Sequence, residues 1–273
     1  MINKRKRIRA RFESLADRNQ SGLITFITAG DPDYNSSKDI LLGLPQAGAD
    51  LIEIGMPFTD PMADGPVIQS SSKRALSSGQ NMDKTLKMVE IFRRHDPDTP
   101  IILMGYYNPI YSYGTEKFSI AAANAGVDGL IVVDLPPEEE KELVQPAITA
   151  GIDFVRLTTP TSDNERLRKL VRTASGFIYH ISIAGITGTH SAETEIIEDA
   201  IDRIREESDL PIAVGFGIKT PKQAAEIARI ADATVVGSAI VERIADGIGS
   251  ADGIYNVLKY VSEMAHGVHT ARG

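Results

Sequence analysis

The chain has 273 residues, of which 42% are hydrophobic and 24% charged, and its formal net charge is −8 at pH 7. These values are ordinary for a globular protein, and the acidic balance argues against nucleic acid or an anionic membrane as a partner, because both require clustered cations. The sequence holds no cysteine and no apolar run of the ~20 residues that span a bilayer. We therefore expect a cytoplasmic protein without disulfides, thiolate metal sites or a cysteine nucleophile.

The first element expected along the chain is an N-terminal helix. The opening, MINKRKRIRARFESLADRNQ, is basic but is not followed by the apolar core of a signal peptide. Ile8, Phe12 and Leu15 recur at helical spacing. The pattern predicts an amphipathic helix over about residues 3–18 that covers one end of the domain.

Eight short stretches rich in apolar and β-branched residues follow. They are nearly continuous in apolar residues rather than alternating, which is typical of parallel strands buried on both faces. Amphipathic helical segments are predicted between them, for example over 81–95, 136–150 and 192–207, and helix-start residues occur at Asp163 and Thr220. The predicted strands are 23–28, 50–54, 101–105, 129–133, 153–157, 177–182, 211–215 and 233–237.

Strands that alternate with helices in a chain of this length predict a (β/α)8 barrel of the TIM type, formed as a single domain by residues 1–273. A doubly wound open sheet is the alternative. In such barrels the site is built from loops at the carboxyl ends of the strands. Residues that directly follow each strand are therefore the candidates for function.

Three carboxylates lie in the stretch EIGMPFTDPMADG (53–65). Glu53 is inside an apolar strand, so burial should raise its pKa towards neutrality and suit it to proton transfer. The alternative is a strand-end acid bound into a local hydrogen-bond network. Asp60 and Asp64 lie in a loop stiffened by proline, where turn formation is the simpler explanation for either one alone.

Glycine clusters follow the last three predicted strands, at 184–188, 215–217 and 237–239. Barrels often bind phosphate between the loops after strands seven and eight and the N-terminus of a short helix, through backbone N–H groups. The segment AGITGTHSAET (184–194) also has the small, polar composition of a lid that closes over a substrate.

Several kinds of site are not supported by the sequence. A Schiff-base aldolase needs a lysine inside the barrel, but no predicted strand contains one, and Lys219 lies before a helix start. The five histidines are scattered, with His180 expected in the core, so no metal site is predicted. No nucleotide-binding fingerprint occurs. The residues alone thus indicate cofactor-free acid–base chemistry on a small phosphate ester.

The segment LIEIGMPFTDPMADGPVIQ (51–69) closely resembles the signature of the tryptophan synthase alpha chain family. Further pieces that match lie in order along nearly the whole chain, at 25–33, 105–114, 125–139, 179–188, 214–221 and 235–241. The resemblance implies a (β/α)8 barrel with an extra N-terminal helix. It also implies a lyase of tryptophan biosynthesis that cleaves indole-3-glycerol phosphate to indole and D-glyceraldehyde 3-phosphate, a retro-aldol reaction.

The same resemblance implies roles for individual residues. Glu53 matches the general acid/base and Asp64 the second catalytic carboxylate, whereas Asp60 is assigned to loop structure or subunit contact. The implied substrate-binding residues are Phe26, Tyr106, Ile131, Tyr179 and Thr187, and the implied phosphate-binding residues are Gly188, Gly217, Gly237 and Ser238. The chain departs from the family in the lid, which continues TGTHSAE, and at Ile183.

The resemblance further implies an allosteric α2β2 heterotetramer with a β subunit that carries pyridoxal phosphate, while this chain holds no cofactor and no metal. Another phosphate-binding barrel, such as an indole-3-glycerol phosphate synthase or a pentose-phosphate epimerase, would require a barrel lysine or metal-ligating histidines. A catalytically idle barrel that only activates a β subunit remains the alternative of another class.

Overall fold

The computed structural model describes residues 6–182, 190–215 and 217–272, without the side chains of 190–193. Within these residues all strands belong to one parallel sheet, in the order β5-β4-β3-β2-β1-β9-β8-β7-β6. The strands are β1 (Gly22–Thr28), β2 (Leu51–Gly55), β3 (Ile101–Gly105), β4 (Gly129–Val132), β5 (Asp153–Phe154), β6 (Arg156–Thr158), β7 (Ile178–Ile181), β8 (Ile212–Gly215) and β9 (Ala233–Val236).

The sheet closes on itself through the segment that holds β5 and β6. β5 pairs with β4 and β6 pairs with β7, and the N–H of Val155, between them, donates to the Leu130 carbonyl at 2.9 Å. The sequence predicted one strand over 153–157, but the hydroxyl of Ser175 accepts the Phe154 N–H at 2.8 Å. That side-chain bond takes the place of a ladder bond and divides the strand in two. The predicted (β/α)8 barrel is confirmed.

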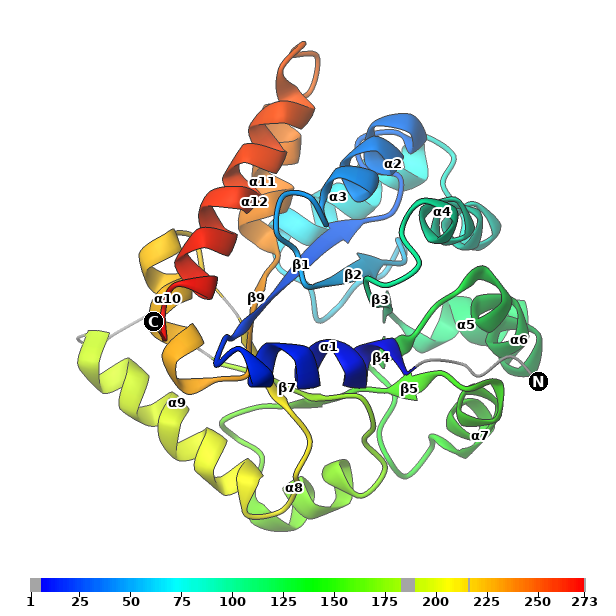
Figure 1. Ribbon diagram of the computed structural model, residues 1–273. Coiled ribbons are helices and arrows are strands. Elements are labelled where there is room, and N and C mark those ends of the chain that lie inside the picture. Colours follow the sequence, from blue (N-terminus) through cyan, green and yellow to red (C-terminus); the bar gives the residue numbers. More distant parts are fainter. Residues whose placement is uncertain (1–5, 183–189, 216, 273) are drawn as a thin grey trace.

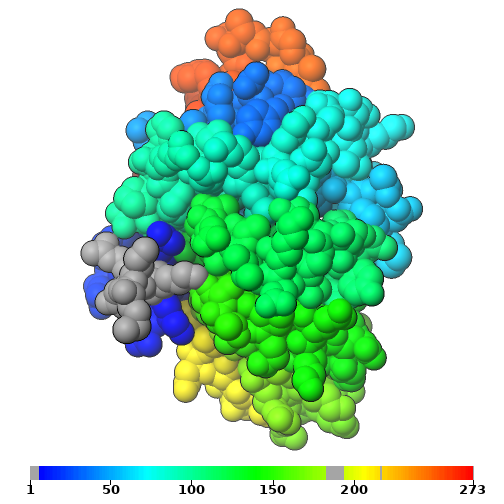
Figure 2. All heavy atoms as spheres, turned by 90° about the vertical axis from the view of Figure 1, so that its right-hand side faces the viewer, coloured from blue at the N-terminus to red at the C-terminus, as the bar shows by residue number. Residues whose placement is uncertain are grey.

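The helices surround this barrel. They are α1 (Arg7–Asp17), α2 (Tyr34–Gly43), α3 (Pro66–Ser77), α4 (Met82–His95), α5 (Tyr107–Tyr113), α6 (Thr115–Ala125), α7 (Lys141–Ala150), α8 (Asn164–Val171), α9 (His190–Arg205), α10 (Pro221–Ile230), α11 (Ser238–Asp246) and α12 (Gly253–His269). Asp163 caps α8 and Thr220 forms a capping box at α10, as predicted. From the right-hand side of Figure 1, helices α4 to α7 cover the barrel (Figure 2).

The helix predicted over 136–150 begins five residues late, at Lys141. The N–H of Glu139 donates to the Pro136 carbonyl at 3.0 Å, a three-residue spacing that belongs to a turn. Proline at 136 and 137 therefore starts a turn, and the α-helix follows it. Among the helices described, none combines the length and the hydrophobicity that crossing a membrane requires.

Helix α1 closes the N-terminal end of the barrel (Figure 1). Ile8 and Phe12 belong to the same apolar cluster as the inward side chains of the strands, and the rings of Phe12 and Phe177 lie 5.7 Å apart. Arg7 donates to Asp128, directly before β4, at 2.7 Å. The amphipathic helix predicted from Ile8, Phe12 and Leu15 thus fills the end of the barrel opposite to the loop between β2 and α3. Residues 3–5 of the prediction lie outside the described residues.

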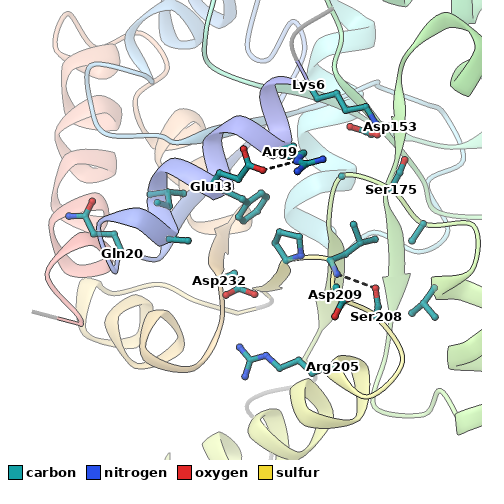
Figure 3. A pocket seen from close by; sticks show the side chains of 18 of the residues that line it. Lys6, Arg9, Glu13, Gln20, Asp153, Ser175, Arg205, Ser208, Asp209 and Asp232 are labelled. Atoms are coloured by element: carbon teal, nitrogen blue, oxygen red, sulfur yellow. Dashed lines mark hydrogen bonds and ion pairs between the residues drawn. The ribbon is translucent and has the colours of Figure 1, made fainter.

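A large groove of about 970 Å³ lies beside α1 at this closed end (Figure 3). Its charged rim is largely satisfied by the protein itself. Arg9 pairs with Glu13 at 2.7 Å, and Arg272 donates to the carbonyls of Ala228 and Ala231. Catalysis in barrels of this type occurs at the other end. The groove is therefore not the candidate active site.

Candidate active site

Glu53 lies inside the barrel on β2. It is 1% exposed, and its Oε1 atom has no hydrogen-bond partner among the described residues. Burial raises the pKa of this carboxyl to about 8, because the apolar surroundings disfavour its charged form. Register places Glu53 between Phe26 of β1 and Ile102 of β3. A carboxyl in this state is protonated at neutral pH and can both give and take a proton.

Tyr179 and Ile131 face the same interior. The pKa of the Tyr179 hydroxyl is raised well above its ordinary value by burial and by the charge of Glu53. Ile131 is fully buried in the cluster of inward side chains that also includes Met104 and Tyr179. Strands β2, β4 and β7 therefore bring Glu53, Ile131 and Tyr179 together in the interior of the barrel.

Glycines at the ends of the strands make room for the aromatic rings of the site. A Cβ atom at Gly55 would lie 2.6 Å from Cζ of Phe26, and one at Gly215 would lie 3.0 Å from the Tyr179 hydroxyl. Both distances are shorter than a van der Waals contact. The sequence assigned Gly215 to the phosphate-binding cluster, but a Cβ atom there would also lie 2.6 Å from Cβ of Val235 on β9, so this glycine lets both Val235 and Tyr179 approach the backbone.

Asp64 lies in the loop between β2 and α3. Its backbone N–H donates to the Pro61 carbonyl at 3.0 Å, and its own carbonyl accepts from the Gln69 side chain at 2.8 Å. Burial raises the pKa of the Asp64 carboxyl, and hydrogen bonding by the Tyr106 hydroxyl acts in the opposite direction. Asp60 is exposed and accepts a hydrogen bond from the neighbouring Thr59 hydroxyl. It is thus held by the loop itself.

A small cavity of about 20 Å³ lies under this loop, where Phe26, Asp64 and Tyr106 meet. The rings of Phe58 and Tyr106 pack 5.7 Å apart at its edge. The other lining residues were not predicted. Two of them, Thr28 and Met104, could have been found, because they lie two positions after Phe26 and Ile102 on the same strands and so face the same side. The further lining residues are Thr28, Gly55, Met56, Phe58, Pro61, Ile68, Ser72, Met104, Gly105 and Val133.

Three of the four predicted phosphate-binding residues, Gly217, Gly237 and Ser238, lie at the ends of two neighbouring strands. Gly237 is the N-cap of α11 and Ser238 its first residue, directly after β9. Gly217 follows β8 with a φ of 74°, and β8 pairs with β9. Free N–H groups at a helix N-terminus attract anions. Thr187, Gly188, Ile183 and residues 184–189 of the predicted lid lie outside the described residues, and α9 begins at His190.

The remaining candidates have structural partners. The Lys219 side chain is 58% exposed and pairs with Glu242 at 3.3 Å. His180 is buried against the Thr158 hydroxyl at 3.1 Å, and burial with the nearby Arg203 lowers its pKa to about 4. In the part of the chain that the structure describes, no group of His, Asp and Glu side chains is arranged to hold a metal ion.

Known proteins resemble this chain over almost its full length. The family model described as tryptophan synthase alpha chain matches residues 12–271. Tryptophan synthase subunit alpha from Legionella pneumophila is 37% identical, with a TM-score of 0.89 over 96% of this chain and 98% of that one. A chain of tryptophan synthase from M. tuberculosis is 31% identical, with a TM-score of 0.87 over 96% and 98%. The chain therefore belongs to the tryptophan synthase alpha chain family.

Proposed function

We propose that this chain cleaves indole-3-glycerol phosphate into indole and D-glyceraldehyde 3-phosphate, that Glu53 transfers the protons, and that Asp64 stabilises the charge that develops on the indole ring. Membership of the family supports the reaction. The observation that carries the assignment of roles is the buried carboxyl of Glu53, whose pKa is raised to about 8 and whose Oε1 atom has no hydrogen-bond partner among the described residues. The reaction is a retro-aldol cleavage that needs one group to deliver and remove a proton in turn.

The protonated carboxyl of Glu53 first gives its proton to C3 of the indole ring. The ring nitrogen then carries positive charge, and the ring becomes an electron sink. The resulting carboxylate of Glu53 takes the proton of the C3′ hydroxyl, the bond between C3 and C3′ breaks, and its electron pair returns to the ring. Glu53 ends protonated, so each cycle leaves it unchanged.

Asp64 acts as a carboxylate in this scheme. It accepts a hydrogen bond from the indole N–H and stabilises the positive charge that develops on the ring after protonation at C3. Its position beside the cavity edged by Phe26 and Tyr106 supports this role. The small size of the cavity implies that the loop over it moves when a ring enters.

Binding is assigned to the remaining predicted residues. Phe26, Tyr106, Ile131 and Tyr179 form the apolar pocket for the indole ring, with Thr187 at its lid. The backbones of Gly188, Gly217, Gly237 and Ser238 bind the phosphate. The start of α11 at Ser238 supports this assignment, because its N–H groups are available to an anion.

Members of the family pair with a β subunit. We propose an allosteric α2β2 assembly in the cytoplasm, with pyridoxal phosphate in the β subunit, and a single-domain α chain over residues 1–273. The motif loop, residues 55–66, is the proposed docking segment, together with residues 106–113. The Met62 side chain on this loop is 82% exposed, and such apolar exposure favours contact with a partner protein.

The test is to incubate the chain and a β subunit with indole-3-glycerol phosphate and to measure both products. We expect equimolar indole and glyceraldehyde 3-phosphate in the absence of serine. Phosphate-free indole-3-glycerol should be a poorer substrate by about 100-fold in kcat/KM, because charged hydrogen bonds at the phosphate are lost. No cleavage would contradict the function and favour the idle barrel. Equal use of both substrates would contradict the phosphate site.

A further inference from the structure

The hydroxyl of Tyr106 lies between two consecutive residues of the motif loop. It accepts the backbone N–H of Ala63 at 3.0 Å. A tyrosine hydroxyl has one hydrogen to donate, and the Asp64 carboxylate lies within its hydrogen-bonding reach. The same oxygen therefore holds the loop backbone at Ala63 and lies close to the carboxyl of the next residue, Asp64.

The ring that carries this hydroxyl has little freedom to move. Tyr106 is 3% exposed and is the N-cap of α5, directly after β3. Its ring packs on Phe58 of the motif loop at 5.7 Å between centroids. Burial and the charges of Asp64 and Asp134 raise the pKa of the Tyr106 hydroxyl to about 12. The hydroxyl thus stays protonated at neutral pH and remains a donor.

The Asp64 side chain depends on this donor. Its backbone is fixed by Pro61 on one side and Gln69 on the other. Tyr106 lines the same small cavity as Asp64, and within residues 6–182, 190–215 and 217–272 its hydroxyl is the one group that lowers the pKa of the Asp64 carboxyl against the effect of burial. Without the hydroxyl, the carboxylate would be free to rotate about its side-chain bonds.

We propose that Tyr106 is a positioning residue for Asp64, in addition to lining the indole pocket: its hydroxyl fixes the loop backbone at Ala63 and directs the Asp64 carboxylate towards the substrate. This inference rests on the proposed function of Asp64. A carboxylate displaced by about 1 Å loses up to ~100-fold in rate. The phenyl ring of a Tyr106→Phe variant would still fill the pocket, so the loss falls on kcat rather than on KM.

The experiment compares steady-state cleavage by wild type, Tyr106→Phe, Asp64→Asn and the double variant. We expect Tyr106→Phe to lower kcat by about 10-fold to 100-fold with KM close to that of wild type. In the Asp64→Asn background the same change should have little further effect, because the carboxylate that it positions is gone. The acidic limb of kcat/KM should move to higher pH in Tyr106→Phe, since the lost hydrogen bond favoured the charged form of Asp64.

Tyr260→Phe is the matched control. It removes the same atom from a buried tyrosine of α12, whose hydroxyl donates to the Lys219 carbonyl at 2.9 Å. Its kcat and pH profile should stay at wild-type values. Equal losses in Tyr106→Phe and Tyr260→Phe would overturn the inference. So would a Tyr106→Phe loss of the same factor with and without the Asp64 carboxylate.

A readout without turnover separates this inference from the proposed function. The pKa of the Asp64 carboxyl can be followed by NMR of carboxyl carbons in wild type and in Tyr106→Phe. An upward shift in the variant supports the positioning contact even if no substrate is cleaved. An unchanged pKa would contradict the contact even if wild type is active.

Discussion

Glu53→Gln should change how the stability of the protein depends on pH. The wild-type carboxyl has a pKa of about 8 when folded, against 4.5 in an unfolded chain. Above pH 4.5 the unfolded state releases a proton that the folded state keeps until about pH 8. The contribution of Glu53 to the free energy of unfolding is therefore fully present below about pH 4.5 and is lost as the pH rises to about 8. Glutamine has no such proton, so the variant lacks this dependence.

The size of the effect follows from the two pKa values. Each pKa unit corresponds to about 1.4 kcal/mol. Between pH 5 and pH 8 the free energy of unfolding of wild type should fall by about 3–4 kcal/mol through Glu53 alone. This is a large part of the ~5–15 kcal/mol that stabilises a typical domain.

The assay is urea denaturation of wild type and Glu53→Gln at several pH values from 5 to 8.5. The difference between the two proteins isolates Glu53, because other groups titrate alike in both. We expect the variant to gain about 3–4 kcal/mol relative to wild type over this range, above any constant offset from the buried amide. Parallel stability curves would refute the reasoning, since they would mean that Glu53 ionises with an ordinary pKa and is solvated.

Three further results follow from the structure. Phe12→Ala should cost about 3–5 kcal/mol in urea denaturation, because it empties the contact with Phe177, while kcat stays at the wild-type value; a cost below ~1 kcal/mol would show that α1 does not seal the barrel. Gly55→Ala should raise KM for indole-3-glycerol phosphate by displacing the Phe26 ring, and an unchanged KM would remove Phe26 from the pocket. In wild type, kcat/KM should fall as pH rises through about 8, when free Glu53 loses its proton, and a flat profile from pH 7 to 9 would contradict that assignment.

The barrel could be predicted because its strands are buried on both faces and read as apolar runs. Seven of the eight predicted strands correspond to single strands of the structure. The eighth is divided because the Ser175 hydroxyl bonds the Phe154 N–H, a contact across 21 residues that no local pattern contains. Helix α7 starts later than predicted because Pro136 and Pro137 begin a turn instead. Proline is also common in the first turn of a helix, so the sequence pattern does not distinguish the two.

The burial of Glu53 could also be predicted, because its neighbours along the strand are apolar and buried on both faces of the sheet. Of the residues that line the small cavity beside Asp64, only Phe26, Asp64 and Tyr106 were predicted. Ser72 and Ile68 reach it from α3, whose rotation about its own axis is set by packing against the barrel. The contact between Tyr106 and the motif loop joins residues more than 40 positions apart. Such pairs follow from the closure of the barrel rather than from the spacing of residues.

The most direct test of Glu53 as the proton-transfer group is the release of glyceraldehyde 3-phosphate from indole-3-glycerol phosphate, with a β subunit added. Wild type, Glu53→Gln and the surface control Glu13→Gln are compared at one pH. We expect wild type and Glu13→Gln to turn over equally and Glu53→Gln to lose at least ~100-fold in kcat. Equal turnover by Glu53→Gln and wild type would contradict the account.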